Sequence, residues 1–316
     1  MVEPPILRRF PALARFPRVA IGTFPTPVQR FELSAAHPLW VKRDDLCAAP
    51  VGGNKVRGLE WLLGDARAGG RVLTVGARGS THALATATYA RRAGAQVTVV
   101  RWNQEMNAAA ARVDALVRRL ARVVDARAVA AAYAIAGVLR LRPRTVWIPA
   151  GGATPVATLG HVNAALELAE QISRGEAAAP DIVVVPLGTG ATSAGIALGL
   201  RISGLRARVA AVRVVPRVVG RRGRVLRLAR AAAEVIERAS GERVPRVQPD
   251  DVDVIHDFYA GAYGRALARL DSETSLVDAG INLDDTYSRK AFAAAAALGP
   301  RRVLLWLTFD GRILEG

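Results

Sequence analysis

Short apolar runs rich in valine alternate along this chain with longer amphipathic segments rich in alanine, leucine and arginine. The runs that we interpret as buried strands are 71–77, 95–100, 144–152, 181–188, 207–215 and 301–309. The segments that we expect to be helical are 80–94, with Ser80 at its N-cap, 106–120, 128–140, 156–172, 196–204 and 284–299. Strands that alternate with helices predict a mostly parallel sheet with helices on both faces. We expect two such α/β lobes, with the substrate between them at the carboxyl ends of the strands.

The composition excludes several classes of protein. The hydrophobic fraction of 51% excludes a disordered chain, and no apolar run reaches the roughly 18 residues that span a bilayer, so we expect no membrane partner. Residues 1–19 are interrupted by proline and arginine and do not resemble a signal peptide. Cys47 is the single cysteine, which excludes an internal disulfide and favours a reducing cytoplasm.

The net charge of +17 raises the alternative of a nucleic-acid-binding protein. The densest basic stretch, 213–246, interleaves its arginines with alanine, valine, leucine and glutamate at helical spacing, which indicates a solvated helix face. No zinc-finger spacing, aromatic-rich segment or basic tail accompanies it. We therefore expect no nucleic-acid partner; that alternative would require binding with a steep dependence on salt.

Lysine is scarce in this basic chain. Of its 44 lysine and arginine residues only three are lysines, Lys42, Lys55 and Lys290, and Lys55 directly follows Gly-Gly-Asn. A lysine amine can lose its proton and form a Schiff base, whereas a guanidinium stays charged and is not a nucleophile. The retained Lys55 therefore suggests chemistry that arginine does not perform.

A glycine loop, PLGTGATSAG at 186–195, follows a predicted strand and opens a helix, which is where backbone amides hold a phosphate. Ser193 replaces the last glycine of the dinucleotide fingerprint, and the Walker lysine is missing. A monophosphate bound with the hydroxyls of Thr189 and Thr192 remains, and so does a tight turn without a ligand. Pyridoxal 5′-phosphate (PLP) needs both a Schiff-base lysine and a phosphate cradle, so Lys55 and the loop together favour this cofactor.

Further motifs occur in consistent order over most of the chain: FPTPV, WVKRDDLCAAPVGGNKVRG, GARGSTHALATATYARRAG, IPAGGATPVATLGHVNAALELA, VVVPLGTGATSAGIALGL, DFYAGAYGR and LDDTYSRKAF. Together they resemble the D-cysteine desulfhydrase and 1-aminocyclopropane-1-carboxylate (ACC) deaminase family of PLP-dependent enzymes. The resemblance implies an α/β fold of the tryptophan synthase β-like, fold type II architecture, with two twisted, mostly parallel sheets, the cofactor in the cleft between them, and a homodimer. It implies a larger PLP-binding domain formed by 1–57 and 147–316 and a smaller domain formed by 58–146.

The resemblance also assigns roles to residues. Lys55 would hold PLP and, once freed by substrate, move the proton at Cα, with Asn54 at the ring hydroxyl. The remaining positions implied to contact the cofactor are Gly188, Thr189, Gly190, Ala191 and Thr192 as the phosphate loop, with Ser288 and Thr308 near the ring. The positions implied to face the substrate are Ser80, Thr81 and His82 at a helix N-terminus, with Ser80 also catalytic, and the catalytic tyrosines Tyr263 and Tyr287.

Simpler interpretations remain open for some of these positions. Ser80 also fits a residue that is only a helix cap, and His82 fits a histidine that only hydrogen-bonds to the backbone. The histidines are too scattered to predict a metal site, and the charges of the KRDD motif at 42–45 fit internal pairing better than cation binding.

Three departures from the family pattern bear on the substrate. Thr81 stands where the family has asparagine, and LWLTFDG at 305–311 stands where it has His-Thr-Gly-Gly. Phe309 or Asp310 therefore replaces a hydroxyl or glycine beside the pyridine ring, unless Thr308 substitutes for it. Ser288 stands where ACC deaminases carry glutamate, which resembles the desulfhydrase side of the family.

These observations predict a PLP-dependent lyase or deaminase. The expected reaction is α,β-elimination on a small D-amino acid such as D-cysteine, giving a 2-oxo acid and ammonia. The alternatives are an ACC deaminase or a β-replacement enzyme of a specialised biosynthetic pathway. An alternative of another class is a PLP-fold protein that binds a ligand without catalysis.

Overall fold

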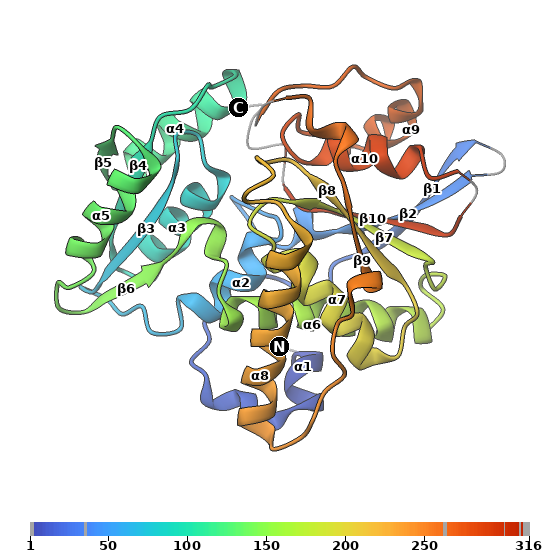
Figure 1. Cartoon of the computed structure of the whole chain (residues 1–316), viewed down its shortest axis with the longest axis horizontal. Helices are drawn as coiled ribbons and strands as arrows, with labels where there is room; N and C mark the ends of the chain where they lie inside the picture. The colour runs from blue at the N-terminus through green and yellow to red at the C-terminus, as the bar shows by residue number, and fades with distance from the viewer. Residues whose placement is uncertain (1–2, 35–36, 262–263, 300, 310, 312–316) are drawn as a thin grey trace.

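The computed structural model describes residues 3–34, 37–261, 264–299, 301–309 and 311. The described chain forms two separate sheets that lie side by side (Figure 1). The larger has the order β1-β2-β10-β7-β8-β9, with β1 Val28–Ser34, β2 His37–Arg43, β7 Ile182–Leu187, β8 Arg208–Arg213, β9 Val252–Ile255 and β10 Val303–Leu307. The smaller has the order β5-β4-β3-β6, with β3 Arg71–Ala77, β4 Gln96–Trp102, β5 Arg122–Ala126 and β6 Thr145–Ile148.

Nearly every strand pair in both sheets is parallel, as the alternation of strands and helices predicts. The exception among the described residues is the pair β1–β2, which is antiparallel. Strands β1, β2, β5 and β9 were not predicted from the sequence, because they mix polar residues with apolar ones and lack a long valine run. The proposed domain limits remain a prediction; the limit at 57/58 falls within a helix, and the one at 146/147 falls within β6.

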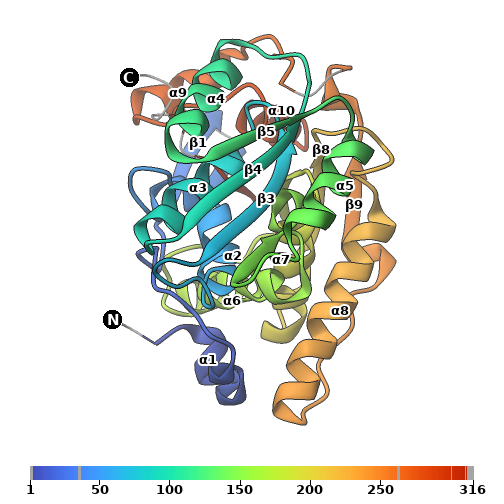
Figure 2. The ribbon, with the colours of Figure 1, turned by 90° about the vertical axis from the view of Figure 1, so that its left-hand side faces the viewer.

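Helices cover both faces of each sheet. Those around the larger sheet are α1 Pro5–Arg9, α6 Pro155–Ser173, α7 Ala191–Ser203, α8 Arg222–Ser240, α9 Thr274–Asp278 and α10 Ser288–Ala296. Those around the smaller sheet are α2 Lys55–Leu62, α3 Thr81–Arg92, α4 Ala108–Leu120 and α5 Val129–Leu139. Figure 2 shows α3 and α5 on opposite sides of the smaller sheet.

Strand β7 shows why the apolar runs have no polar alternation. Val183 and Val185 pack with α6, α7 and α8, whereas Ile182 and Val184 pack with α9 and α10 on the other face. Successive side chains of a strand point to opposite faces, so a strand covered on both faces must be apolar at every position.

Several predicted elements are shorter in the structure, and two of them have clear local reasons. Helix α10 begins at Ser288 rather than 284, because the carboxylate of Asp284 accepts hydrogen bonds from the backbone N–H groups of Thr286, Tyr287 and Ser288 (2.9, 2.8 and 3.0 Å) and holds these residues in a turn. The strand predicted over 144–152 ends at Ile148, because Gly151 and Gly152 follow with φ of +68° and +65°.

A buried network of charges fastens α2 to the larger sheet and to α6. Arg57 donates to Asp44 (2.7 Å) and to Glu167 (3.0 Å), and Lys42 pairs with Glu167 at 2.5 Å. Within the KRDD motif Arg43 also pairs with Asp45 (2.8 Å). The expected pairing of these charges is therefore confirmed, although two of the partners lie outside the motif. Among the residues described here, no cluster of histidine, cysteine, aspartate and glutamate could hold a metal ion.

The basic stretch of the sequence forms helix α8. Its buried positions, Val225, Ala229, Ala232, Ala233 and Ile236, repeat at helical spacing. Most of its arginines face solvent, as predicted from their spacing. Within the described ranges, no helix is long and apolar enough to cross a membrane.

Candidate active site

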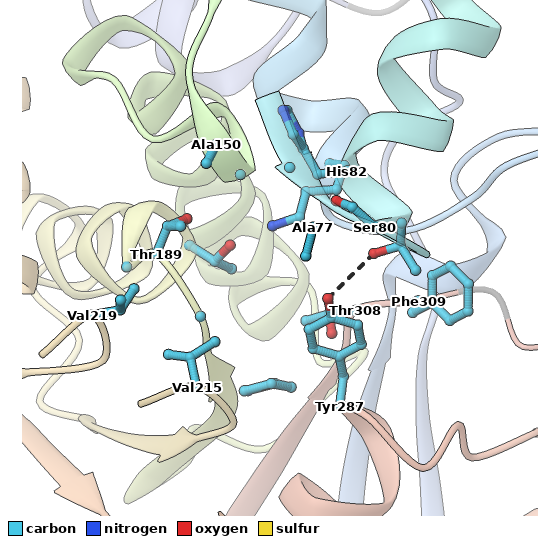
Figure 3. A pocket seen from close by; sticks show the side chains of 18 of the residues that line it. Ala77, Ser80, His82, Ala150, Thr189, Val215, Val219, Tyr287, Thr308 and Phe309 are labelled. Atoms are coloured by element: carbon cyan, nitrogen blue, oxygen red, sulfur yellow. Dashed lines mark hydrogen bonds between the residues drawn. The ribbon is translucent and has the colours of Figure 1, made fainter. Parts of the chain in front are cut away.

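A cavity of about 660 Å³ opens between the two sheets (Figure 3). Its wall includes Ala77 and Trp102, which end β3 and β4, together with Gly188, Val215 and Thr308, which follow β7, β8 and β10. The cavity therefore lies at the carboxyl ends of strands from both sheets, which is where open parallel sheets bind ligands.

Lys55 is the first residue of α2 and lines this cavity. The two preceding glycines bring the chain there. A Cβ at Gly52 would lie 2.0 Å from the carbonyl oxygen of Asp45, and one at Gly53 would lie 2.5 Å from that of Thr308. Gly53 also has a φ of +116°, a conformation that residues with a side chain rarely adopt.

The surroundings of Lys55 make its amine easier to deprotonate than that of an exposed lysine. Burial lowers the pKa of Lys55 to about 8, and no carboxylate of the described chain forms an ion pair with it. Lys42 belongs to the buried network, and Lys290 donates to the carbonyl oxygen of Tyr259 (3.2 Å). Neither Lys42 nor Lys290 is part of the cavity wall. Among the described residues of that wall, Lys55 is the one lysine.

Residues of the glycine loop line the same cavity as Lys55. A Cβ at Gly188 would meet no atom within 4 Å, and Gly190 has a φ of +98° directly before α7. Thr189 and Thr192 line the cavity, and so does Ser193, whose buried hydroxyl has no hydrogen-bond partner within the described chain. First-turn amides, two threonine hydroxyls and an orphaned serine hydroxyl fit a phosphate group.

Asn54 joins these two parts of the site. Its side-chain amide donates to the hydroxyl of Thr192 (2.7 Å), and that hydroxyl lies 3.5 Å from Nε2 of His161. Burial and the charge of Lys55 lower the pKa of His161 well below its usual value, so this imidazole is neutral. The predicted contact of Asn54 with a cofactor ring remains a prediction.

The N-terminus of α3 forms the opposite wall. Ser80 caps the helix, and its Oγ accepts the N–H of Ala83 at 3.3 Å. The hydroxyl of Thr81 donates to that of Tyr287 at 3.4 Å, the contact drawn as a dashed line in Figure 3. Nε2 of His82 lies 3.1 Å from the hydroxyl of Thr74, so this ring contacts a side chain rather than only the backbone. Burial, with the charge of Lys55, lowers the pKa of His82 to about 3, so His82 is neutral as well.

The unusual residues after β10 also lie at the cavity. The N–H of Asn54 donates to the carbonyl oxygen of Thr308 (3.0 Å), and Gly53 and Phe309 form an antiparallel bridge. Thr308 and Phe309 both line the cavity, and the Phe309 ring lies 6.4 Å from that of Tyr287. The substitution of Thr308 for the missing family hydroxyl remains a prediction.

Not every predicted site residue is brought to the cavity. Ser288 is buried behind Tyr287 and does not belong to the described wall; its hydroxyl has no partner there, and its N–H donates to Asp284. Ala191 is buried in the first turn of α7 and is likewise not part of that wall. Tyr263 and Asp310 lie outside the described residues.

Arg224 and Tyr259 were not among the site residues predicted from the sequence. Both line the cavity, and Nε of Arg224 donates to the carbonyl oxygen of Thr189 at 2.9 Å. Arg224 lies within the basic stretch that we interpreted as solvated. The available signal in the sequence was the pair of glycines, Gly220 and Gly223, that precede this arginine.

The residues present fit PLP: one lysine of low pKa, a glycine loop opening a helix, and a second helix N-terminus opposite. The fold and site therefore define a PLP-dependent enzyme of fold type II. The sequence model of the family described as "Pyridoxal-phosphate dependent enzyme" matches residues 19–308. The chain belongs to this family, which confirms the predicted cofactor and the prediction of an enzyme.

Three relatives show which branch of the family is similar. The chain is 35% identical to a putative ACC deaminase of Pyrococcus horikoshii (90% of this chain, 87% of the relative). It is 38% identical to nocardicin C-9′ epimerase of Nocardia uniformis (89% and 88%) and 30% identical to D-cysteine desulfhydrase of Klebsiella pneumoniae (89% and 88%). The predicted resemblance to the ACC deaminase and D-cysteine desulfhydrase branch is confirmed.

Solved structures confirm the fold. A crystal structure of an ACC deaminase homologue superposes with a TM-score of 0.80 at 30% identity, covering 98% of this chain and 95% of the other. A threonine deaminase of Solanum lycopersicum superposes with a TM-score of 0.62 at 16% identity (100% and 93%), which shows the shared fold alone.

Proposed function

We propose that this enzyme carries out α,β-elimination on a small D-configured or achiral amino acid, with D-cysteine as the leading candidate. The observation that carries the proposal is that Lys55, the glycine loop and the hydrogen-bonded pair of Thr81 and Tyr287 line one cavity. PLP, when bound, supplies the electron sink that makes the Cα–H bond of an amino acid acidic. The residues that would hold it are Lys55 and the loop 188–192, with Thr308 beside the ring.

The chain's own residues would divide the remaining work. Lys55, once displaced by substrate, takes the proton from Cα as a neutral amine, and its low pKa favours that form near pH 8. The unpaired amides at the N-terminus of α3 bind the substrate carboxylate. The hydroxyl of Tyr287, which accepts a hydrogen bond from Thr81, also lines the cavity and protonates the leaving group.

The overall reaction balances without an oxidant. The Cα–H and Cβ–S bonds of D-cysteine break, and sulfide leaves with its electron pair and a proton. Water then hydrolyses the released enamine to pyruvate and ammonia. Exposed Glu105 is the one carboxylate of the described cavity wall. The described wall therefore offers Lys55 as the one lysine base, and elimination needs one base to remove the Cα proton.

A product assay tests this proposal. Purified protein with PLP should release equal amounts of pyruvate and ammonia from D-cysteine, β-chloro-D-alanine or D-serine. The absence of pyruvate from all three would refute the elimination. Formation of 2-oxobutyrate from ACC would favour the ACC deaminase alternative, and capture of an added thiol in place of pyruvate would favour β-replacement. Family membership favours any of these over a ligand-binding protein without catalysis.

The relative of 38% identity favours a second candidate, epimerisation at an amino-acid carbon. This reaction begins with the same removal of the Cα proton by Lys55. It differs in that Tyr287, from the wall opposite, would return a proton to the other face of the carbon. Turnover in D₂O distinguishes the two: epimerisation inverts the carbon and adds deuterium without releasing ammonia, whereas elimination releases ammonia.

We also infer, from the resemblance alone, a homodimer in the cytoplasm. Light scattering of the purified protein measures the first property, and a mass of about one chain would contradict it.

A further inference from the structure

The first turn of α8 gathers positive charge where a helix disfavours it. Arg221 is the N-cap, Arg222 and Arg224 follow, and no acidic residue occupies this turn. The N-terminus of a helix carries a partial positive charge, which attracts anions and repels cations. Arg222 lies 3.4 Å from Asp253, but Arg224 has no ion pair within the described chain. An anion from outside the protein would relieve this repulsion.

Helix α8 packs directly against the glycine loop. A Cβ at Gly190 would lie 3.5 Å from the side chain of Val225 and 3.6 Å from that of Leu228. This packing places Arg224 beside the loop, where its Nε donates to the carbonyl oxygen of Thr189 (2.9 Å). Arg224 is half-buried and lines the cavity together with Thr189.

We infer that Arg224 is the counter-charge for the phosphate of the cofactor, an inference that rests on the placement of that phosphate at loop 188–192. The bond from Nε to Thr189 fixes the plane of the guanidinium, while its two terminal nitrogens keep four further N–H donors. A phosphate monoester carries about −1.5 to −2 charges at pH 7, whereas a helix N-terminus supplies only about half a positive charge. Arg224 supplies a full positive charge at the same place, and arginine–phosphate hydrogen bonds are among the strong ones.

The test compares PLP with pyridoxal, which has the same aldehyde and ring but no phosphate. Their equilibrium binding is followed by visible absorbance in the wild type and in R224Q, R224K and R227Q. Glutamine keeps a donor that can reach Thr189 but removes the charge, whereas lysine keeps the charge. Arg227 is the matched control, because it lies on the same helix, is exposed and does not line the cavity.

We expect the PLP affinity of R224Q to be at least about tenfold lower than that of the wild type. Its pyridoxal affinity should stay within about threefold of the wild type. R224K should recover part of the PLP affinity, and R227Q should bind both compounds as the wild type does. The difference between R224Q and the wild type should shrink as salt rises, because added ions screen a charge contact.

Two results would overturn it. Unchanged PLP affinity in R224Q would show that the charge is not used. Equal losses for PLP and pyridoxal would show that Arg224 only braces the loop. These outcomes concern Arg224 alone and need no turnover. A wild type that binds neither compound would instead refute the placement of the cofactor and, with it, this inference.

Discussion

The side-chain amide of Asn54 donates a 2.7 Å hydrogen bond to the hydroxyl of Thr192, a residue 138 positions further along the chain. The bond ties the start of α2, which carries Lys55, to the start of α7, which carries the glycine loop. It therefore sets the spacing between the amine and the phosphate cradle. Two sequence motifs become one site through this contact and the cavity that they line.

Lys55 should be the attachment point of PLP. Because the chain has only three lysines, reduction of the loaded protein with borohydride followed by peptide mass spectrometry gives a simple readout. We expect the pyridoxyl group on the peptide containing Lys55, and we expect K55A to lose the visible absorbance band. Modification of Lys42 or Lys290 instead would contradict the assignment.

The pKa of Lys55 should be directly measurable in cofactor-free protein. Reductive ¹³C-methylation followed by NMR titration should show a lysine signal that is absent from K55A and titrates near pH 8, because burial lowers the pKa of Lys55 to about 8. Burial also lowers the pKa of Lys290 to about 8, so the comparison with K55A identifies the signal of Lys55. Between pH 8 and about 10.5 the unfolded chain then binds more protons at this lysine than the folded chain. Lys55 therefore contributes more to the stability of the folded state, and the free energy of unfolding increases, as pH rises through that window. Titration near 10.5 would show that the amine is not desolvated.

Two variants of Ser80 should separate helix capping from substrate binding. S80A loses the cap of α3 and should lower the free energy of unfolding by about 1 kcal/mol. S80D keeps a capping oxygen and should retain stability. Its negative charge should nevertheless raise KM about tenfold or more by repelling the substrate carboxylate. Chemical denaturation and steady-state kinetics measure these effects, and an unchanged KM in S80D would leave Ser80 as a cap only.

Thr308 rather than Ser288 should be the hydroxyl beside the cofactor ring. Thr308 lines the cavity, whereas the hydroxyl of Ser288 is buried away from it. We expect T308V to shift the absorbance maximum and weaken PLP binding about tenfold, the loss of roughly one hydrogen bond, with T308S close to wild type. S288A is the matched control and should bind PLP normally. The opposite pattern would reassign the role to Ser288.

Arg57 should be required for folding stability rather than for chemistry. R57M removes the shared partner of Asp44 and Glu167 and leaves two buried carboxylates with one lysine. Loss of one partner from a buried ion pair costs about 3–5 kcal/mol, which urea denaturation should detect. R302M, which breaks an exposed ion pair with Asp181, should leave stability nearly unchanged. Similar small losses in both variants would show that the network is dispensable.

The sequence by itself determined the fold class and the cofactor, and it singled out Lys55 as the proposed reactive residue. Hydrophobic periodicity and apolar runs are local properties of the sequence, so the apolar strands β3, β7 and β10 and the helix between β7 and β8 are readable without coordinates. Lys55 and the loop 188–192 were readable because glycine positions and a rare lysine report directly on backbone approach and nucleophilic chemistry. Strands β1, β2, β5 and β9 were not, since they mix polar with apolar residues and their formation depends on pairing with other strands.

Only the tertiary structure decided which residues share the cavity. It placed Thr308 in the wall and left Ser288 buried outside the described wall, although both belong to motifs of the same family. It also showed that Arg224, unlike the exposed arginines of α8, lies beside the glycine loop, because the first turns of that helix pack on Gly190. The physical reason is that a side chain's surroundings come from elements distant in the chain. Neither periodicity nor motif spacing records which of two neighbouring polar groups faces the ligand.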